Sequence, residues 1–242
     1  MRIIIASPSK TGNIWVKFLL ADIYGLKVLD EVPGIPTESL KEFVDQGSFV
    51  ESSIFHQHFR PTRSFFDIMD RLEAHIVTTI RHPYDVFVSL YFYIQRLSHL
   101  FPPGTHFYPL VGKPIDDPEI IRYLERGDDG FGMQVALALA WVESRRSILV
   151  RYEDLVADTR KTIREITRSI APVSERAMRR AVEANRADRM RRKGDNLVYH
   201  VRKGTSGDWR NHLTTAHLEA INSIHGTQIA RLGYDLHDGP TS

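Results

Sequence analysis

One lysine stands in a turn of small residues that could bind a phosphate group. Lys10 follows a β-branched apolar run at residues 2–7 and precedes an apolar segment led by Trp15. A turn between a strand and a helix leaves backbone N–H groups pointing outward, and with the positive end of the helix dipole these form an anion site. Lys10 could then reach the phosphate oxygens. A plain turn with a solvated lysine is the alternative, and this segment alone does not decide between the two.

The order of residues separates this turn from the common nucleotide-hydrolysing type. A Walker A loop runs glycine, four residues, glycine, lysine, then serine or threonine. Here no glycine precedes Lys10 in the turn and the next glycine is Gly12, so the hydroxyl that would hold magnesium is not in its usual place. Acidic metal ligands are not obvious either. A phosphate bound at this turn would therefore have no evident magnesium ligand beside it.

Two further segments carry cations where a phosphate could bind. Arg81 ends a β-branched run, and in an open α/β sheet ligands lie beyond the carboxyl ends of the strands. Its planar guanidinium could bind a second phosphate, although a buried arginine paired with Asp85 is the alternative. Arg202 and Lys203 precede Gly204. The two side chains supply positive charge, and the glycine lets the backbone N–H groups come close to a phosphate. An exposed basic turn is the alternative there.

Together, and in this order, the three segments resemble the cytosolic-type sulfotransferases, which use 3′-phosphoadenosine-5′-phosphosulfate (PAPS). Residues 10–15 match the family's 5′-phosphosulfate loop, and residues 81–91 match its 3′-phosphate motif. Its C-terminal Arg-Lys-Gly-x-x-Gly-Asp-Trp motif is intact at residues 202–209, and Arg-Tyr-Glu-Asp-Leu at residues 151–155 is similar to a family strand end. The resemblance spans residues 3–234, and it implies the sulfotransferase fold.

This resemblance implies transfer of a sulfuryl group from PAPS to a hydroxyl group or amine, leaving adenosine 3′,5′-bisphosphate (PAP). Lys10 would counter the charge that develops on the bridging oxygen. Trp15 would stack near the adenine, and Tyr152 would lie near the adenosine. The residues implied to hold the nucleotide are Lys10, Thr11, Gly12, Asn13, Ile14 and Trp15 at the 5′ end, Tyr152, and Arg81, Ser89, Arg202, Lys203 and Gly204 at the 3′-phosphate.

A histidine commonly serves as the general base in this family, and the resemblance places it at His58, just upstream of Pro61. His56 lies two residues earlier. Residues two apart in a strand share a face, so the two histidines could exchange roles. An ordinary imidazole titrates near pH 6.5 and can accept a proton at neutral pH.

The sequence departs from the family pattern in three places. The lysine that precedes the family's histidine is His56 here, so one cation near the sulfuryl group is absent or replaced. Two threonines of the phosphosulfate loop are Asn13 and Ile14, so the loop would rely more on backbone donors. The short C-terminal dimer motif of the animal enzymes is not found, and we expect a monomer or a weak homodimer.

Strands alternating with helices predict an α/β fold with a mainly parallel central sheet flanked by helices. We find no repeat and no shift in composition, so residues 1–242 are predicted to form one domain. Segment 98–116 is a long loop rich in proline, glycine and aromatic residues, and segment 185–204 is basic and irregular. Strands are predicted at 2–7, 51–59 and 75–83, with a short one near 26–29, and residues 147–155 are predicted to be a strand that turns into a helix. Helices are predicted at 13–25, 37–46, 64–74, 84–97, 132–145, 159–184 (two, split near Pro172) and 214–232.

The composition is that of an ordinary globular chain, with 42% hydrophobic and 26% charged residues and a formal net charge of +2. No cysteine is present, which excludes disulfides, thiolate metal sites and a cysteine nucleophile. The N-terminal apolar run is too short for a signal peptide, and no run approaches the length of a membrane span. We therefore expect a cytoplasmic protein without a membrane partner.

Three other functions were weighed against sulfuryl transfer. A P-loop kinase-like nucleotide transferase would need magnesium. A catalytically degenerate homologue would bind the nucleotide without transfer. A nucleic-acid binder built on residues 186–203 is disfavoured, because the basic residues there are not interleaved with aromatic ones. Residues 186–196 are instead expected to form a solvated charged loop that is part of a lid over PAPS, and a docking patch for an acidic acceptor is the alternative. The acceptor is expected to be a small-molecule alcohol or phenol, and a peptide or sugar natural product is the alternative. Its apolar part could contact Phe49, Phe55, Phe101, Phe107 and Tyr108, which could equally be core residues.

Overall fold

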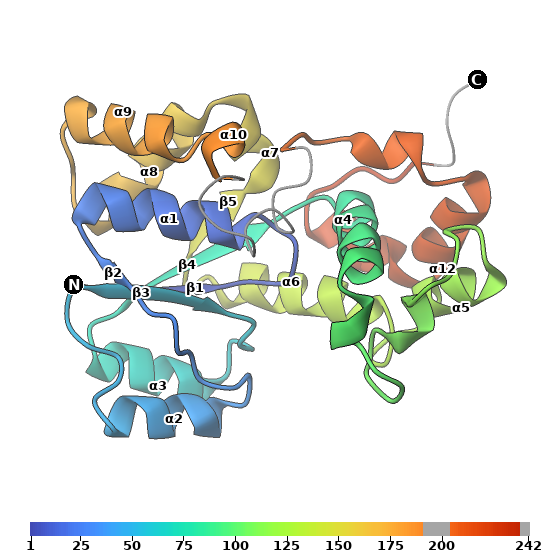
Figure 1. The fold of residues 1–242 in the computed structure, drawn as a ribbon, viewed down its shortest axis with the longest axis horizontal. Coiled ribbons are helices and arrows are strands. Elements are labelled where there is room, and N and C mark those ends of the chain that lie inside the picture. The colour runs from blue at the N-terminus through green and yellow to red at the C-terminus, as the bar shows by residue number, and fades with distance from the viewer. Residues whose placement is uncertain (191–203, 238–242) are drawn as a thin grey trace. The chain divides into compact units, whose positions relative to one another are not determined.

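The computed structural model describes residues 1–190 and 204–237 (Figure 1). The chain divides into two compact units, Met1–Arg81 with Ala140–Gly204 and His82–Leu139 with Thr205–Ser242. We describe each unit by itself, and the prediction of one domain stays a prediction. No helix in the described part of the chain is long and apolar enough to cross a membrane.

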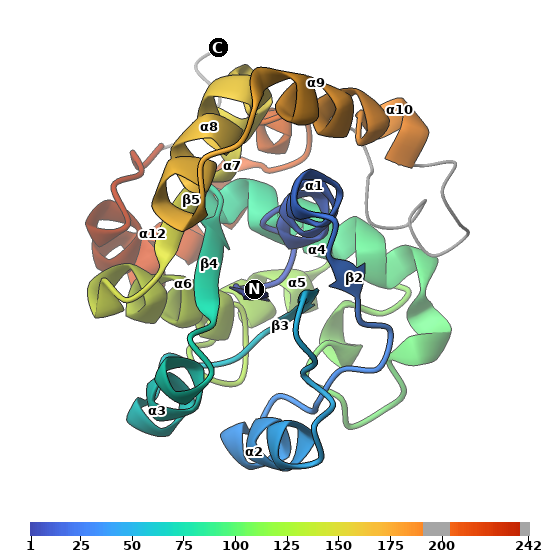
Figure 2. The same ribbon diagram turned by 90° about the vertical axis from the view of Figure 1, so that its left-hand side faces the viewer.

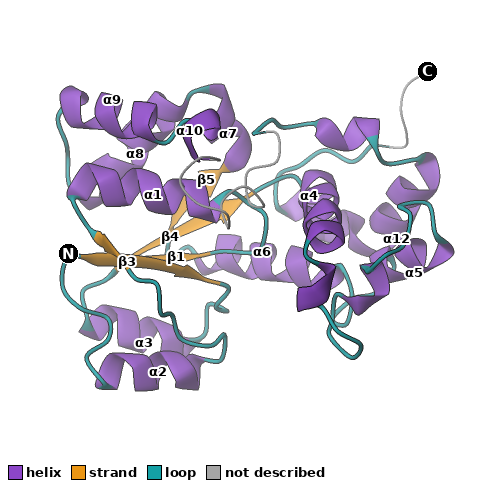
Figure 3. Ribbon diagram, viewed as in Figure 1, coloured by secondary structure: helices purple, strands orange, loops and turns teal. Residues whose placement is uncertain are grey.

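The first unit is built on a sheet of five parallel strands (Figure 3). Its order is β2-β3-β1-β4-β5, so the direction of winding reverses at β1. In such sheets a crevice opens at the carboxyl ends of the strands where the winding reverses. The strands are β1 (Arg2–Ala6), β2 (Lys27–Val28), β3 (Ser53–Gln57), β4 (His75–Ile80) and β5 (Ile148–Arg151).

Helices cover both faces of this sheet. Helices α1 (Asn13–Tyr24), α8 (Thr159–Ile170) and α9 (Glu175–Ala184) lie on one face, and α2 (Thr37–Asp45) and α3 (Arg63–Arg71) lie on the other (Figures 1 and 2). The continuous apolar run of β1 follows from this double cover, because both faces of a central parallel strand are buried. The fully buried core residues between α1 and the sheet include Ile3, Ile5, Val16, Leu19 and Ile54.

Shorter elements complete the first unit. Helix α7 (Tyr152–Ala157) follows β5 directly, and α10 (Ala187–Met190) follows α9. Helix α6 (Gly132–Ser144) ends in this unit, where Trp141 is 1% exposed and donates from Nε1 to the Phe59 carbonyl at 2.9 Å. The same indole packs edge-to-face against Phe65 of α3, which ties the end of α6 to that helix.

The second unit contains only helices among its described residues. Its helices are α4 (Pro83–Arg96), α5 (Pro118–Leu124), the part of α6 up to Leu139, α12 (Thr215–Arg231) and the 3₁₀ turns η1 (Ser98–Leu100), η2 (Tyr108–Leu110) and η3 (Asp208–Asn211). Two buried histidines of α12 fasten it to the preceding chain: Nε2 of His225 contacts the Leu124 carbonyl, and Nε2 of His217 contacts the Ile115 carbonyl, both at 2.8 Å.

The predicted α/β fold with a parallel sheet is confirmed, and each predicted strand and helix is present within a few residues of its expected ends. Helix α5 was not predicted. It is short, and its main signal is an Asp117 side chain that accepts from the Glu119 N–H just before an apolar turn. The segment predicted as a long loop contains η1 and η2, and α10 falls in the segment predicted as irregular.

Candidate functional site

Four residues predicted to do chemistry follow four different strands of the sheet. Lys10 comes after β1, His58 after β3 and Arg81 after β4, and Tyr152 begins α7 at the end of β5. All four belong to the first unit. Because the carboxyl ends of parallel strands meet at one edge, the topology brings residues that are far apart in sequence to the same edge of the sheet.

Internal hydrogen bonds fix the turn after β1. The Ser7 hydroxyl is fully buried and accepts from the Thr79 N–H at 2.8 Å. The Thr11 hydroxyl donates to the Pro8 carbonyl at 2.9 Å and lies 2.7 Å from the hydroxyl of Thr79. Both hydroxyls therefore form hydrogen bonds within the protein that stabilise the turn. A phosphate at this turn would be bound by the backbone N–H of Thr11 and not by its hydroxyl.

The backbone of this turn is left-handed at two positions. Lys10 has φ +62° and Gly12 has φ +93°. A Cβ at position 12 would lie 2.6 Å from Cδ2 of Tyr152, so only glycine fits there. Gly12 caps α1 without a side-chain hydrogen bond, which leaves the helix N-terminus open to a ligand. One donor is already engaged, since the Ile14 N–H donates to Oδ1 of Asn13 at 2.8 Å.

Three of the predicted nucleotide-binding residues lie around the ring of Tyr152. The guanidinium carbon of Arg81 lies 4.3 Å from the ring centroid, and the Trp15 ring meets it edge-on at 6.4 Å. Gly12 lies against the same ring. Arg81 is 8% exposed and Tyr152 is 7% exposed, so the arginine and the ring form a nearly buried stack.

Asn185 is a residue of this region that the sequence did not reveal. It is fully buried at the end of α9, and its carbonyl accepts from Nε1 of Trp15 at 2.9 Å. Its side-chain amide donates to Asp22 on α1 at 2.6 Å and to the Ala181 carbonyl at 2.9 Å. Asn185 thereby holds the predicted adenine-stacking residue in place. The sequence offers one indication of Asn185, namely that asparagine is common just after the C-terminus of a helix.

The two histidines at the end of β3 lie together, with ring centroids 6.3 Å apart and planes at 82°. Nδ1 of His58 lies 2.7 Å from the Ser7 carbonyl oxygen, and Nε2 lies 3.4 Å from the Ser9 hydroxyl. Since a carbonyl only accepts, Nδ1 carries the proton of the neutral ring, and the lone pair of Nε2 faces the Ser9 hydroxyl, from which it can accept. Burial lowers the pKa of His58, the Ser7 hydrogen bond raises it, and the charge of Lys10 lowers it further.

His56 has a different partner. Nζ of Lys17, on α1, lies 3.2 Å from Nδ1 of His56. Lys17 is 8% exposed, and burial lowers its pKa while the charge of Asp30 acts in the opposite direction. Sequence reasoning missed Lys17. Its signal was a lysine within the apolar stretch of α1 at residues 14–21, between the buried Val16 and Leu20.

In the second unit, Asp85 of α4 holds the turn of the C-terminal motif. Its carboxylate accepts from the backbone N–H groups of Gly207 at 2.6 Å and Trp209 at 3.1 Å. Asp85 is 1% exposed and Trp209 is 3% exposed. The Gly-Asp-Trp half of the motif is thus anchored to the helix that begins right after Arg81, a role for Asp85 that sequence analysis did not foresee.

The remaining predicted residues are placed as follows. Ser89 lies partly buried on α4, in the second unit, and Gly204 has the left-handed φ of +74° that its motif requires. Arg202 and Lys203 lie outside the described residues. Within the described part of the chain no group of three acidic or histidine side chains could hold a metal ion, and the metal-free site stays a prediction.

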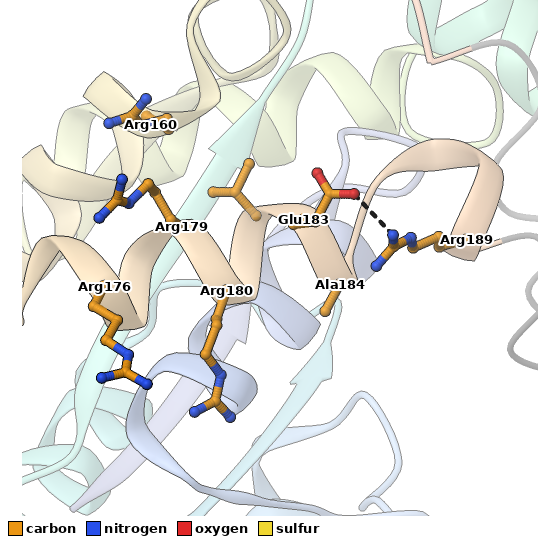
Figure 4. A pocket seen from close by; sticks show the side chains of 8 residues that line it. Arg160, Arg176, Arg179, Arg180, Glu183, Ala184 and Arg189 are labelled. Carbon is orange, nitrogen blue, oxygen red and sulfur yellow. Dashed lines mark ion pairs between the residues drawn. The ribbon is translucent and has the colours of Figure 1, made fainter.

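A separate cavity of about 760 Å³ lies on the surface formed by α8, α9 and α10 (Figure 4). None of the predicted site residues that the structure describes lines it, and two of its lining residues, Arg189 and Glu183, form an ion pair of 2.9 Å. The cavity therefore does not belong to the site at the strand ends. Its lining consists of Arg160, Arg176, Arg179, Arg180, Val182, Glu183, Ala184 and Arg189.

Comparison with curated proteins finds sulfotransferases. Sulfotransferase 2B1 of Mus musculus is 27% identical, in a match that covers 75% of this chain but only 55% of that protein. The chain thus spans about half the length of this relative. Sulfotransferase 2A1 of Macaca fascicularis is 23% identical, and the match covers 97% of this chain and 86% of that protein.

Solved structures show the same fold. Mouse sulfotransferase SULT7A1 complexed with PAP has a TM-score of 0.73 at 17% identity, covering 98% of this chain and 89% of that chain. Retinol dehydratase in complex with androsterone and PAP has a TM-score of 0.65 at 15% identity, covering 95% of this chain and 81% of that chain; a complex with retinol and PAP is also similar. The predicted sulfotransferase fold is confirmed.

A family model settles the membership. The model described as "Sulfotransferase domain" matches residues 1–233, nearly the whole chain. That range includes each segment from which the resemblance was first argued, from the Lys10 turn to the Gly-Asp-Trp motif. The chain belongs to the sulfotransferase family.

Proposed function

We propose that this sulfotransferase transfers the sulfuryl group of PAPS to a hydroxyl group, or an amine, of a small-molecule acceptor, with His58 as general base. The observation that carries the proposal is the hydrogen bond of 2.7 Å from Nδ1 of His58 to the Ser7 carbonyl. This bond leaves Nε2 as the acceptor of a proton, next to the turn that holds Lys10. PAP in the similar solved structures supports the choice of nucleotide.

The residues at the strand ends fit a doubly phosphorylated adenosine. The uncapped N-terminus of α1 and the ammonium of Lys10 suit the 5′-phosphate, and Gly12 keeps the backbone clear of a side chain that would otherwise fill the space beside Tyr152. Arg81 presents a guanidinium made rigid by its stack on Tyr152, which suits the 3′-phosphate. Ser89, Arg202, Lys203 and Gly204 would complete that phosphate site, as the resemblance implies.

The transfer breaks one S–O bond and forms another. The acceptor oxygen attacks the sulfur in line, and its proton passes to Nε2 of His58. The electron pair of the broken bond stays on the bridging oxygen, which becomes a 5′-phosphate oxygen of PAP. Lys10 counters the charge as it develops there. The Ser7 carbonyl supports His58 throughout, because it stabilises the Nδ1–H that remains when the ring becomes positive.

The acceptor is proposed to be an alcohol or a phenol. Two of the similar structures, both of retinol dehydratase, hold androsterone or retinol, which are small molecules with a hydroxyl group. Two of the aromatic residues considered for the acceptor, Phe49 and Phe55, are 3% and 0% exposed and pack on each other at 4.9 Å, so they are core residues. Phe101, Phe107 and Tyr108 remain candidates.

The proposal includes a cytoplasmic location, a monomer or weak homodimer, and no nucleic-acid partner. The absence of cysteine fits a reducing compartment, since no disulfide is available to stabilise the chain. A single domain over residues 1–242 is part of the same proposal.

Incubation with ³⁵S-labelled PAPS and a panel of alcohols and phenols tests the function. We expect label in at least one acceptor, and titration calorimetry should show binding of PAP. His58→Ala should abolish most of the transfer while PAP affinity stays within a factor of about two, since His58 acts on the acceptor and not on the nucleotide. PAP binding without transfer to any acceptor would favour a nucleotide-binding homologue, and an absolute need for magnesium would favour a kinase-like transferase.

A further inference from the structure

A buried ammonium group lies against an imidazole close to the nucleotide-binding turn. Nζ of Lys17 is 3.2 Å from Nδ1 of His56, and the lysine is 8% exposed. Its neighbours on α1, Val16 and Leu19, are fully buried. An ammonium in such surroundings is costly unless a polar group compensates it, so its contact with His56 calls for an explanation.

The contact fixes the tautomer of His56. A lysine ammonium has only donors, so Nδ1 of His56 accepts and the neutral ring carries its proton on Nε2. His58 is the opposite case, because its Nδ1 donates to the Ser7 carbonyl and its Nε2 is left with a lone pair. Two imidazoles at the end of one strand, with centroids 6.3 Å apart, are therefore held in opposite tautomers. One offers an N–H and the other offers a lone pair.

We propose that Lys17 is a positioning residue that holds His56 as an Nε2–H donor to an oxygen of the transferred sulfuryl group. This inference rests on the proposed function and deepens it. His56 donates a hydrogen bond without losing its proton, while the acceptor's proton goes to His58. Lys17 stays charged. Through its contact with His56, it supplies the positive charge that the family resemblance leads one to expect at position 56 itself.

The chemistry of the pair favours this division of roles. A charged donor at Nδ1 withdraws electron density from the ring and makes the Nε2–H a stronger donor. The oxygens of the transferred sulfuryl group are negatively polarised, and a hydrogen-bond donor placed in advance can stabilise them during transfer. His56 could not serve as the base through Nδ1, because Lys17 occupies that lone pair. This arrangement favours His58 as the base in our proposal.

The tautomer can be tested without any substrate. In protein with ¹⁵N-labelled histidine, NMR should show His56 with an unprotonated Nδ1 and a protonated Nε2, and His58 with the reverse. Lys17→Met keeps the length and apolar stem of the side chain, so the fold should be retained, and the His56 signals should shift toward the other tautomer. The matched control is Lys41→Met, which removes an exposed lysine of α2 that pairs with Asp45. It should leave both histidines unchanged.

Kinetics then test the role. Lys17→Met should slow single-turnover transfer from PAPS by about tenfold to a hundredfold, with PAP affinity within a factor of about two. The double variant Lys17→Met/His56→Lys returns an ammonium to the strand and should recover most of the lost rate. Any of three results would overturn the inference. The His56 signals could be unchanged in Lys17→Met, the single-turnover rate of that variant could equal that of the wild type, or the double variant could be no faster than Lys17→Met. If the wild-type protein transfers no sulfuryl group from PAPS, the proposed function is overturned instead. NMR would still determine the tautomers of His56 and His58, because that experiment needs no substrate.

Discussion

The guanidinium of Arg81 lies 4.3 Å from the centre of the Tyr152 ring, and both side chains are nearly buried. Arg81 follows β4 and Tyr152 follows β5, so the stack joins the ends of two neighbouring strands. A cation above an aromatic face is stabilised by the ring quadrupole, and a planar guanidinium also stacks there. The arginine is therefore oriented before any nucleotide binds.

Arg81→Lys keeps the charge but removes the planar group that stacks on Tyr152. We expect PAP to bind about tenfold to thirtyfold more weakly, because a loss of about 2 kcal/mol is typical of a desolvated cation–π contact. Titration calorimetry with PAP measures this. Arg146→Lys is the control, since Arg146 stacks on Phe66 at an exposed position away from the strand ends, and its PAP affinity should not change.

Gly12→Ala should destabilise the fold more than Gly25→Ala. Both glycines have positive φ, and an alanine in that conformation costs about 1–2 kcal/mol. A Cβ at position 25 meets nothing within 4 Å, whereas one at position 12 meets Tyr152 at 2.6 Å. The clash adds about 1–3 kcal/mol. Urea unfolding of the two variants measures the difference, and equal losses would contradict the close approach of Tyr152.

Asp85→Ala should lower the free energy of unfolding by about 3 kcal/mol, because two N–H groups at Gly207 and Trp209 lose a charged acceptor. Asp85→Asn, which keeps one acceptor oxygen, should fall between this variant and the wild type. Denaturant unfolding is the measurement. Asp45→Ala removes an exposed carboxylate on α2 and should leave the stability nearly unchanged. A similar small effect for Asp85→Ala would show that the turn does not need its anchor.

Transfer should be independent of pH through the neutral range and should fail only in acid. His58 acts when neutral, and burial lowers its pKa below the ordinary value of 6.5. The acid limb of kcat/KM must therefore lie below pH 6.5, where protonation of Nε2 removes the base. A pH–rate profile with its acid midpoint above 6.5 would contradict the assignment of His58.

His82 should make the fold less stable in mild acid. Burial, which outweighs its bond to the Asp235 carbonyl and the nearby Asp85 charge, lowers the pKa of His82 from 6.5 to about 4. Between these values the unfolded chain binds a proton that the folded chain does not, so stability falls as the pH drops from 6.5 to about 4. Because His82 caps α4, with Nδ1 accepting from the Tyr84 N–H, His82→Asn keeps a capping side chain. Unfolding followed over this range should show a smaller pH dependence in that variant.

Periodicity and motif spacing were enough to predict the strands, most helices and the strand ends at which Lys10, His58 and Arg81 lie. These features depend on local pattern and on the general rule for parallel sheets. Lys17 and Asn185 were missed for a different reason. Their roles depend on which side chain from another element meets them, and a buried lysine and a helix-end asparagine have the same local sequence whether or not such a partner exists. Asp85 belongs to a motif recognised in the sequence, but its contact with the backbone of Gly207 could not be predicted, because the two residues are more than a hundred positions apart.

The order of strands across the sheet differs from their order along the chain, and this has a consequence for how activity is acquired during folding. Lys10 and His58 come together only when β1 has paired with β3, and Arg81 joins them only through the pairing of β1 with β4. Tyr152 arrives with β5, which pairs with β4 across a long intervening segment. Closing such distant pairs is slow. Nucleotide affinity should therefore return in the last step of refolding, and nascent chains that end before β5 should remain inactive on the ribosome.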